Sequence, residues 1–144
     1  MKSVSPEKYN KNYYSIFKQP NYRRYNPSLA AKKFREIDAL VNITSKDLIV
    51  DFGCGQGDMC FFLSAKYHCK VIGIDYSKDA IDLALSHLKD FKYAQKQVDI
   101  TFYNLDNDHL PDLSGVKYVF LNDVVEHLYD PELSQVFKKM YSWG

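Results

Sequence analysis

The sequence predicts an α/β fold, a parallel β-sheet with helices on both of its faces. Three observations support this fold class. Short apolar runs alternate with amphipathic segments, a glycine-rich turn follows the first run, and an acidic residue stands at or near the end of each of the first two runs. Strands that alternate with helices form parallel βαβ units with right-handed crossovers, which place helices on both faces.

Each predicted element follows from a local pattern. Four runs rich in apolar and β-branched residues are expected to be buried strands, at residues 48–53, 70–75, 98–105 and 118–122. Helices are expected where apolar residues recur at helical spacing, and Ser28, Ser77 and Asp130 precede three of them as caps. The apolar stripes are Ala30, Phe34, Ile37 and Val41; Met59, Phe62 and Leu63; Ala80, Ile81, Ala84, Leu85 and Leu88; and Leu133, Val136, Phe137 and Met140.

The size of the chain allows one domain. Its 144 residues, of which 46% are hydrophobic, are enough to bury a core of ordinary size. We divide the chain into a tyrosine-rich N-terminal segment, residues 1–27, and an α/β domain, residues 28–144. The segment is expected to be either a lid over the site or a strap packed on the domain.

Charge and composition exclude several classes of partner. The formal net charge is +1, so no nucleic-acid partner is expected. No apolar run approaches the roughly 20 residues of a membrane helix, and the first residues lack the apolar segment of a signal peptide. We therefore expect a cytoplasmic protein that does not bind a membrane. The three cysteines form no CxxC pair and are expected to be reduced thiols.

The segment VDFGCGQGD, residues 50–58, carries the most specific chemistry: a strand with an acidic residue near its end, then a G-x-G-x-G turn that opens a helix. Glycines allow a tight turn and a close approach of the backbone to a ligand. A dinucleotide loop requires G-x-G-x-x-G, but Asp58 occupies the position of the third glycine and would repel a pyrophosphate. Asp51 suits a positively charged ligand instead. A glycine turn that merely connects two elements is the alternative.

Asp75 ends the second predicted strand, where its carboxylate can accept hydrogen bonds from both hydroxyls of a ribose. Dinucleotide enzymes use a similar acid, so Asp75 indicates a nucleoside without choosing the cofactor. The alternative role for Asp75 is to cap the helix that starts near Ser77. Tyr76 is expected either to pack against the adenine or to be exposed at the strand end.

Four motifs together resemble class I S-adenosylmethionine-dependent methyltransferases, which have a Rossmann-like fold. VDFGCGQGD resembles the first motif of that family, GIDYS the acidic loop after the second strand, NLDNDHLP the adenine-contacting segment and LNDVVEHL the fourth-strand motif. The resemblance implies a Rossmann-like parallel sheet of order 3-2-1-4, S-adenosyl-L-methionine as cofactor and a small-molecule methyl acceptor. It implies cofactor contacts from Asp51, Gly53, Cys54, Gly55 and Gly57 around the methionine end, Asp75 and Tyr76 at the nucleoside, Asp106 and Asn107 at the adenine amino edge, and Asn122 beneath the sulfonium.

Asp123, Glu126 and His127 follow the fourth predicted strand, where the acceptor is expected to arrive. His127 is the candidate general base, because an imidazole can take a proton from a nucleophile near neutral pH. A histidine hydrogen-bonded to the backbone is the alternative. In some relatives acidic residues and a histidine in this motif bind a divalent metal, but the pattern here is incomplete and we predict no metal.

Complete members of the family have about seven strands, so the chain is expected to lack strands five to seven. The fourth strand would then be an open edge, which predicts a homodimer, an exchange of elements with a second copy, or cover by the N-terminal segment. Two other functions stay open. One is a module that binds the cofactor or a partner chain without turnover, and the other is a nicotinamide-dependent oxidoreductase, which Asp51 and Asp58 disfavour.

Overall fold

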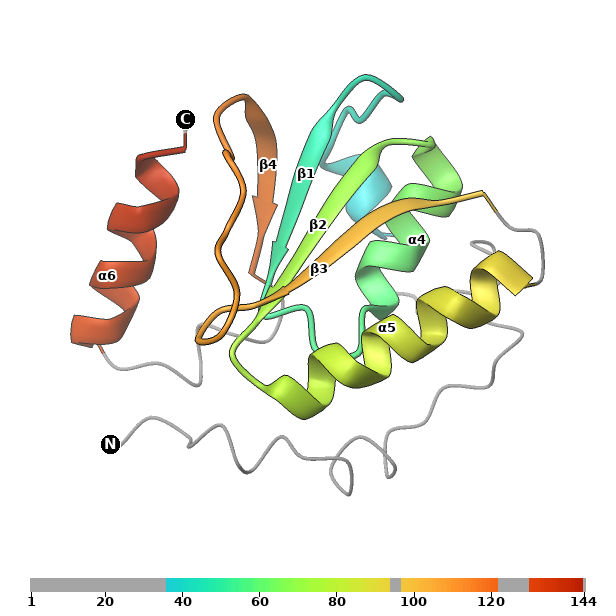
Figure 1. Ribbon diagram of the computed structural model, residues 1–144. Coiled ribbons are helices and arrows are strands. Elements are labelled where there is room, and N and C mark those ends of the chain that lie inside the picture. The colour runs from blue at the N-terminus through green and yellow to red at the C-terminus, as the bar shows by residue number, and fades with distance from the viewer. Residues whose placement is uncertain (1–35, 94–96, 122–129, 144) are drawn as a thin grey trace.

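The computed structural model describes residues 36–93, 97–121 and 130–143 (Figure 1). Within these residues, four strands form a parallel sheet in the order β3-β2-β1-β4, which confirms the predicted fold and strand order. The strands are β1 (Leu48–Phe52), β2 (Lys70–Asp75), β3 (Asp99–Asn104) and β4 (Val116–Phe120). The helices are the 3-10 helix η3 (Ile37–Ala39) and the α-helices α4 (Asp58–Tyr67), α5 (Lys78–Tyr93) and α6 (Asp130–Tyr141).

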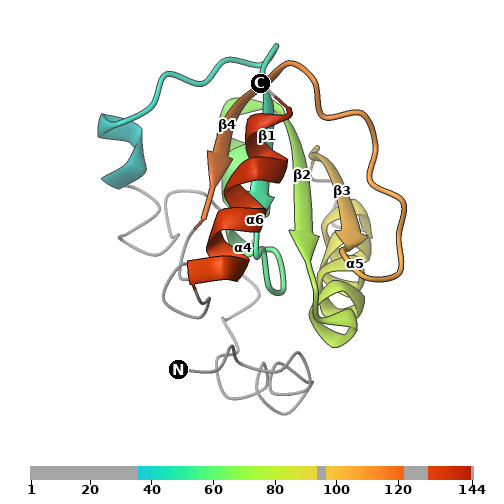
Figure 2. The same cartoon turned by 90° about the vertical axis from the view of Figure 1, so that its left-hand side faces the viewer.

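Helices cover both faces of the sheet. Figures 1 and 2 show α4 and α5 on one face and α6 on the other. Each face has its own buried apolar cluster. The cluster under α4 and α5 includes Ile49, Phe61, Leu63, Val71 and Phe102, and the cluster under α6 includes Val50, Phe52, Ile72, Ile74 and Trp143. Among the described helices, none combines the length and the apolar composition needed to cross a membrane.

The central position of β1 explains its apolar composition. Successive side chains of a strand point to opposite faces, so Ile49 enters the cluster under α4 and α5 while Val50 enters the cluster under α6. β1 pairs with β2 on one side and β4 on the other, and from Ile49 to Phe52 it is buried. Asp51 is therefore an acidic residue inside a buried strand, with only 2% of its surface exposed.

The buried residues of the helices differ from the predicted stripes. Two residues expected to be buried are exposed, and one helix is buried beyond its stripe. Leu85 of α5 is 44% exposed and Phe137 of α6 is 48% exposed, so their predicted burial is wrong. At about 100° per residue, each lies at the margin of its stripe, beyond the width that a helix buries on a sheet. By contrast, all residues of α4 from Met59 to Ser64 are buried, so its burial is not confined to one stripe.

The helix predicted near the N-terminus lies mostly outside the described residues. Its predicted extension to Val41 is wrong, because the 3-10 helix ends at Ala39. The Leu40 N–H donates the closing hydrogen bond to the Ile37 carbonyl oxygen, and Leu40 is 82% exposed. Such turns are common at helix ends and in connectors. Ile37 and Val41 nevertheless pack against the cluster under α4 and α5.

The fourth strand begins at Val116, earlier than predicted, and ends at Phe120. Its register with β1 shifts, because Leu48 pairs with Val116 and Ile49 pairs with Tyr118, which leaves Lys117 as an additional residue. A bulge of this kind interrupts the periodicity by which a strand is predicted. Among the described strands β4 pairs only with β1 and forms the edge of the sheet. Pairing of this edge with a second copy stays a prediction.

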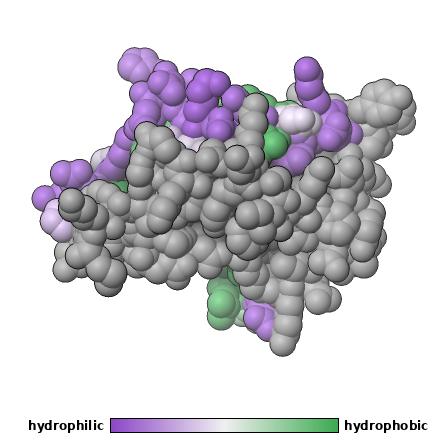
Figure 3. Space-filling model, turned by 90° about the horizontal axis from the view of Figure 1, so that it is seen from below, coloured by the Kyte–Doolittle hydropathy of each residue, from purple (hydrophilic) through white to green (hydrophobic). Residues whose placement is uncertain are grey.

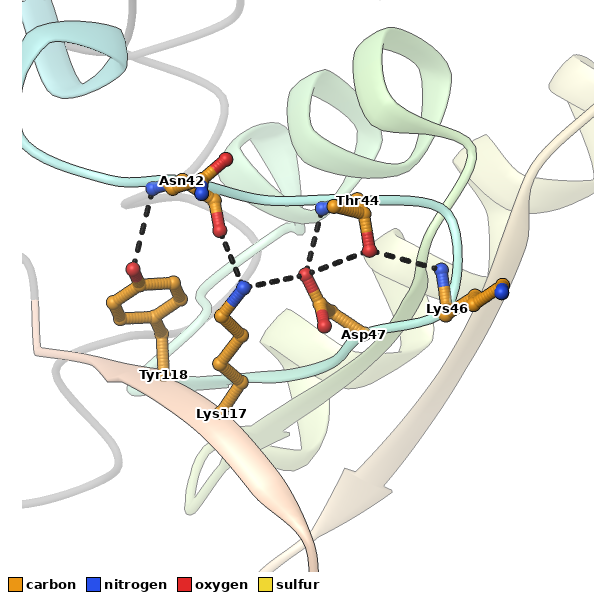
Figure 4. Close-up of polar contacts among 6 residues, drawn as sticks. All are labelled: Asn42, Thr44, Lys46, Asp47, Lys117 and Tyr118. Atoms are coloured by element: carbon orange, nitrogen blue, oxygen red, sulfur yellow. Dashed lines mark hydrogen bonds and ion pairs between the residues drawn. The ribbon is translucent and has the colours of Figure 1, made fainter.

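A polar network joins the start of β4 to the segment that precedes β1 (Figure 4). Lys117 Nζ donates to the Asn42 carbonyl oxygen at 2.6 Å and to Asp47 Oδ2 at 3.0 Å. The Tyr118 hydroxyl accepts from the Asn42 N–H at 3.2 Å. Asp47 Oδ2 also accepts from the Thr44 N–H at 2.6 Å, and these donors lower the pKa of the Asp47 carboxyl. Residues 42–47 thus contact the first half of the edge strand.

Candidate functional site

The candidate site lies at the carboxyl ends of the strands. Because the described strands are parallel, they end at the same edge of the sheet, where the loop of residues 53–57 leaves β1. Figure 3 views the molecule from this end; the described residues visible in it lie at the margins and are mainly hydrophilic, with a small hydrophobic group at the lower margin. Parallel α/β sheets bind ligands at this edge, where the strand order reverses, and β1 is at that reversal.

The glycines of the loop have the backbone conformation that their residue type permits. Gly53, Gly55 and Gly57 have φ angles of 79°, 56° and 91°, a region that side chains disfavour. Gly57 also precedes the first residue of α4. A Cβ atom on Gly57 would lie 2.7 Å from the ring of Phe102, so space as well as conformation requires glycine there.

The amides of the loop donate mainly to the protein itself. Gly53 N and Cys54 N donate to the carbonyl oxygen of Ile74 at 2.7 and 3.0 Å, and Gly57 N donates to the carbonyl oxygen of Cys54 at 3.0 Å. Gly55 N donates to Asp75 Oδ2 at 2.9 Å. A pyrophosphate site depends on amides that point at the ligand. The engagement of these four amides therefore argues against a dinucleotide loop.

Asp75 joins this loop to the start of α5. While its Oδ2 accepts from Gly55, its Oδ1 accepts from the Ser77 N–H at 2.8 Å, and the Ser77 hydroxyl caps the helix by accepting from Ala80 N at 3.2 Å. Ser77 is thus the cap, as predicted, and Asp75 stabilises the turn before it through its hydrogen bond with the Ser77 N–H. Burial raises the pKa of the Asp75 carboxyl, although the backbone N–H groups around it favour the charged form. Each oxygen of a carboxylate has a second lone pair, which leaves acceptor capacity for a ligand hydroxyl.

A second buried carboxylate, Asp51, lies in β1 shortly before the loop. Asp51 Oδ2 is 3.5 Å from the Cys60 thiol, which donates to it from α4. Burial, together with the charges of Asp75 and Asp51, raises the pKa of the Cys54 thiol to about 11. Cys54 is therefore a protonated, buried thiol, and the two carboxylates whose charges reach it give the loop a negative surrounding. The three cysteines are free thiols, as predicted, and all three are buried.

The turn after β3 is organised by Asn104, a residue without a predicted role. Asn104 is 3% exposed, and its Nδ2 donates to the Asp75 carbonyl oxygen at 3.3 Å. Its Oδ1 accepts from both nitrogens of Asn107, at 3.0 Å from the backbone and 2.8 Å from the side chain. Asp106 and Asn107 are exposed in this turn. The polar residue at the end of β3, level with Asp75 in the sheet, is the pattern that could have identified Asn104.

A contact between the glycine loop and α5 was also not predicted from the sequence. The Gln56 side chain is buried, with 7% of its surface exposed, and its Oε1 lies 3.0 Å from Nε2 of His87. No local sequence pattern indicates this contact, because 31 positions separate the two residues.

Several predicted site residues lie outside the described parts of the chain: Asn122, Asp123, Glu126 and His127. Their roles stay predictions. Tyr76 is described and is partly exposed beside Asp75. Within residues 36–93, 97–121 and 130–143, no group of three or more His, Cys, Asp or Glu side chains could hold a metal ion.

Sequence relatives are methyltransferases of varied specificity. The chain is 35% identical over 80 residues to a histone-lysine N-methyltransferase, H3 lysine-79 specific, of Dictyostelium discoideum, covering 56% of this chain and 4% of that protein. It is 35% identical over 79 residues to a probable cobalt-precorrin-6B C(15)-methyltransferase of Methanococcus vannielii, covering 54% of this chain and 43% of that protein. The chain therefore spans less than half the length of these two relatives.

Solved structures show the same fold. Magnesium protoporphyrin IX methyltransferase from Synechocystis PCC 6803, with bound S-adenosylhomocysteine, superposes with a TM-score of 0.69 at 19% identity, covering 96% of this chain and 66% of that one. Phosphoethanolamine N-methyltransferase 2 of Haemonchus contortus, in complex with S-adenosyl-L-methionine, has a TM-score of 0.67 at 19% identity, covering 97% and 33%. Residues 49–143 match the family described as a methyltransferase domain. Because that match spans more than half of the sequence, the chain belongs to the methyltransferase domain family.

Proposed function

We propose that this domain binds S-adenosyl-L-methionine at the carboxyl ends of β1 and β2, and that the enzyme it forms or belongs to methylates a small molecule. The observation that carries the proposal is a pair of buried carboxylates next to a glycine loop: Asp51, in the strand that leads into the loop, and Asp75, which accepts a hydrogen bond from it. Their negative charge suits a ligand that carries an ammonium and a sulfonium, and it opposes the phosphates of a dinucleotide. The similar Synechocystis and Haemonchus structures contain S-adenosylhomocysteine and S-adenosyl-L-methionine.

The residues present fit this cofactor. Gly53, Gly55 and Gly57 lack side chains where the methionine end would approach, and Asp51 contributes negative charge from the strand before the loop. Asp75 accepts the ribose hydroxyls with its remaining lone pairs. In the proposal, Tyr76, Asp106 and Asn107 contact the nucleoside and the adenine, and the backbone of Cys54 contributes to the loop. Asn122, which lies outside the described residues, is proposed to contact the sulfonium.

The bound cofactor would supply a methyl group on a positively charged sulfur. The transfer neutralises charge, so the chain can act largely by aligning the two reactants and excluding water. Such a reaction does not require a conspicuous catalytic triad. In the proposal, His127 takes a proton from the acceptor where the acceptor atom carries one.

Calorimetric titration with S-adenosylhomocysteine and, separately, with NAD tests the cofactor. We expect saturable binding of S-adenosylhomocysteine and none of NAD. Binding of NAD alone would instead support an oxidoreductase and overturn the proposal.

A labelled-methyl assay tests the acceptor. The panel takes its small molecules from relatives, including phosphoethanolamine from the Arabidopsis thaliana enzymes and magnesium protoporphyrin IX from the Synechocystis enzyme, together with a histone H3 peptide. Transfer to a small molecule supports the proposal, and transfer to the peptide alone contradicts its acceptor class. Cofactor binding without transfer to any member would favour the second candidate, a module without turnover.

A further inference from the structure

We propose that His87 is a positioning residue for cofactor binding, acting through Gln56 to hold the glycine loop in its binding conformation. The proposal rests on the cofactor assignment above. The Gln56–His87 contact takes no direct part in methyl transfer. Gln56 Oε1 lies 3.0 Å from His87 Nε2, and since an amide oxygen only accepts, the ring nitrogen carries the hydrogen.

The position of Gln56 gives this hydrogen bond its importance. Gln56 stands between Gly55 and Gly57, both of which have positive φ, so the loop around it can adopt many other conformations in isolation. Its side chain points away from water, with 7% of its surface exposed. A buried amide requires a hydrogen-bond partner, and His87 provides one from α5.

His87 is itself held in place. Its ring lies edge-on to the ring of Phe61, with 6.5 Å between centroids and 70° between planes. Phe61 is fully buried in α4 and contacts Phe102 of β3 at a centroid distance of 5.8 Å. The imidazole on α5 therefore contacts a buried ring of α4, and that ring in turn contacts a ring of β3.

The contact is the second of two adjacent anchors. Gly55 is bound by Asp75 at the end of β2, and Gln56 is bound by His87 on the helix that follows β2. Successive loop residues are thus attached to the same β2–α5 unit at separate points. With both anchors present, the loop is already ordered before a ligand binds. Without one anchor, part of the loop must become ordered on binding, and this cost lowers the affinity.

The test compares His87→Leu, which keeps an apolar contact with Phe61 but removes the donor, with His87→Gln, whose amide nitrogen can donate at a similar reach. Ser86→Ala, an exposed change on α5, is the matched control. Titration with S-adenosylhomocysteine is expected to show a rise in Kd of about 5- to 30-fold for His87→Leu. For His87→Gln and Ser86→Ala we expect a Kd within about threefold of wild type.

A double-mutant cycle separates positioning from a general structural role. In a Gln56→Leu background, His87→Leu is expected to change the Kd little further. Equal weakening in both backgrounds, or a wild-type Kd for His87→Leu, would overturn the proposal. Loss of affinity in His87→Gln equal to that in His87→Leu would also overturn it.

A measurement without ligand keeps the test separate from the cofactor assignment. Hydrogen exchange at the Gly55 and Gly57 amides, both of which donate within the protein, should be faster in His87→Leu than in wild type and in Ser86→Ala. If wild type fails to bind S-adenosylhomocysteine but exchange still accelerates, the cofactor assignment fails while the role of His87 in holding the loop stands. Unchanged exchange would overturn that role.

Discussion

Asp75 Oδ2 accepts a hydrogen bond from the backbone N–H of Gly55 at 2.9 Å, which attaches the loop after β1 to the end of β2. The same carboxylate accepts from Ser77 through Oδ1 at 2.8 Å. One side chain thus links the glycine loop, the central strands and the start of α5. Removal of its charge should therefore affect the site more than removal of any exposed acid.

Asp75→Asn keeps the size of the side chain and removes its charge. We expect this variant to bind S-adenosylhomocysteine about 1–3 kcal/mol more weakly, because charge-assisted hydrogen bonds to the ribose and the loop are lost. Calorimetric titration measures the difference. Asp82→Asn, at an exposed residue of α5 paired with Lys78, is the control and should bind like wild type. Unchanged affinity in Asp75→Asn would show that the ribose assignment is wrong.

Ser64→Ala should lower the free energy of unfolding by about 1–3 kcal/mol, because it leaves two backbone groups without their partner. The buried Ser64 hydroxyl donates to the Cys69 carbonyl oxygen at 3.1 Å and accepts from Asp99 N at 2.8 Å, which joins α4 to the starts of β2 and β3. Urea unfolding measures the effect. Ser86→Ala, which is exposed, should change stability by less than about 0.5 kcal/mol.

Gly73→Ala should destabilise the fold by about 1–3 kcal/mol through overpacking. A Cβ at Gly73 would lie 2.6 Å from Phe102 Cδ1 and 3.0 Å from Cys54 Sγ. Phe102→Leu creates room, so the double variant should be more stable than the sum of the two single effects predicts. Chemical unfolding of the four proteins gives the coupling energy, and strict additivity would contradict the steric explanation.

Asp47→Asn should be less stable than wild type at neutral pH, by an amount that disappears in acid. The pKa of Asp47 is lowered in the folded protein, first by the Thr44 N–H and then by Lys117. A carboxyl whose pKa is lower in the folded than in the unfolded protein stabilises the fold at pH values above the unfolded pKa, which is ordinarily 3.8. This stabilisation is lost as the pH falls through the folded pKa. The difference in the free energy of unfolding between the two proteins, taken from unfolding curves, should therefore shrink as the pH falls below 3.8 toward the folded pKa. A constant difference across that range would exclude the carboxylate charge as its cause.

His68→Gly should stabilise the protein by about 0.5–1 kcal/mol. His68 ends α4 at φ 57° and ψ 27°, a left-handed conformation in which glycine avoids the crowding of a Cβ. The exposed side chain makes this substitution feasible without loss of core contacts. Thermal unfolding measures the gain, and His68→Ala, which keeps a Cβ, should show none of it. A gain in both variants would point to the imidazole instead of the backbone.

The sequence by itself determined the strands of the sheet and the kinds of residue, glycines and an acid, at their carboxyl ends. Buried parallel strands need continuous apolar runs, so 48–53 and 70–75 could be recognised from composition alone. Glycine at positions 53, 55 and 57 reports a backbone requirement that is local, and all three proved to have positive φ. Asp75 could likewise be placed at the edge, because the end of a strand fixes where its last side chain lies.

Only the tertiary structure decided which partners these residues have. The hydrogen bonds of Asp75 with Gly55 and of Gln56 with His87 join segments 20 and 31 positions apart, and such distances depend on how β2 and α5 pack beside β1. Packing also decided that Leu85 at the margin of its stripe is exposed. Local sequence patterns describe one element at a time, whereas these contacts arise where two or three elements meet, so their geometry exists only in the folded chain.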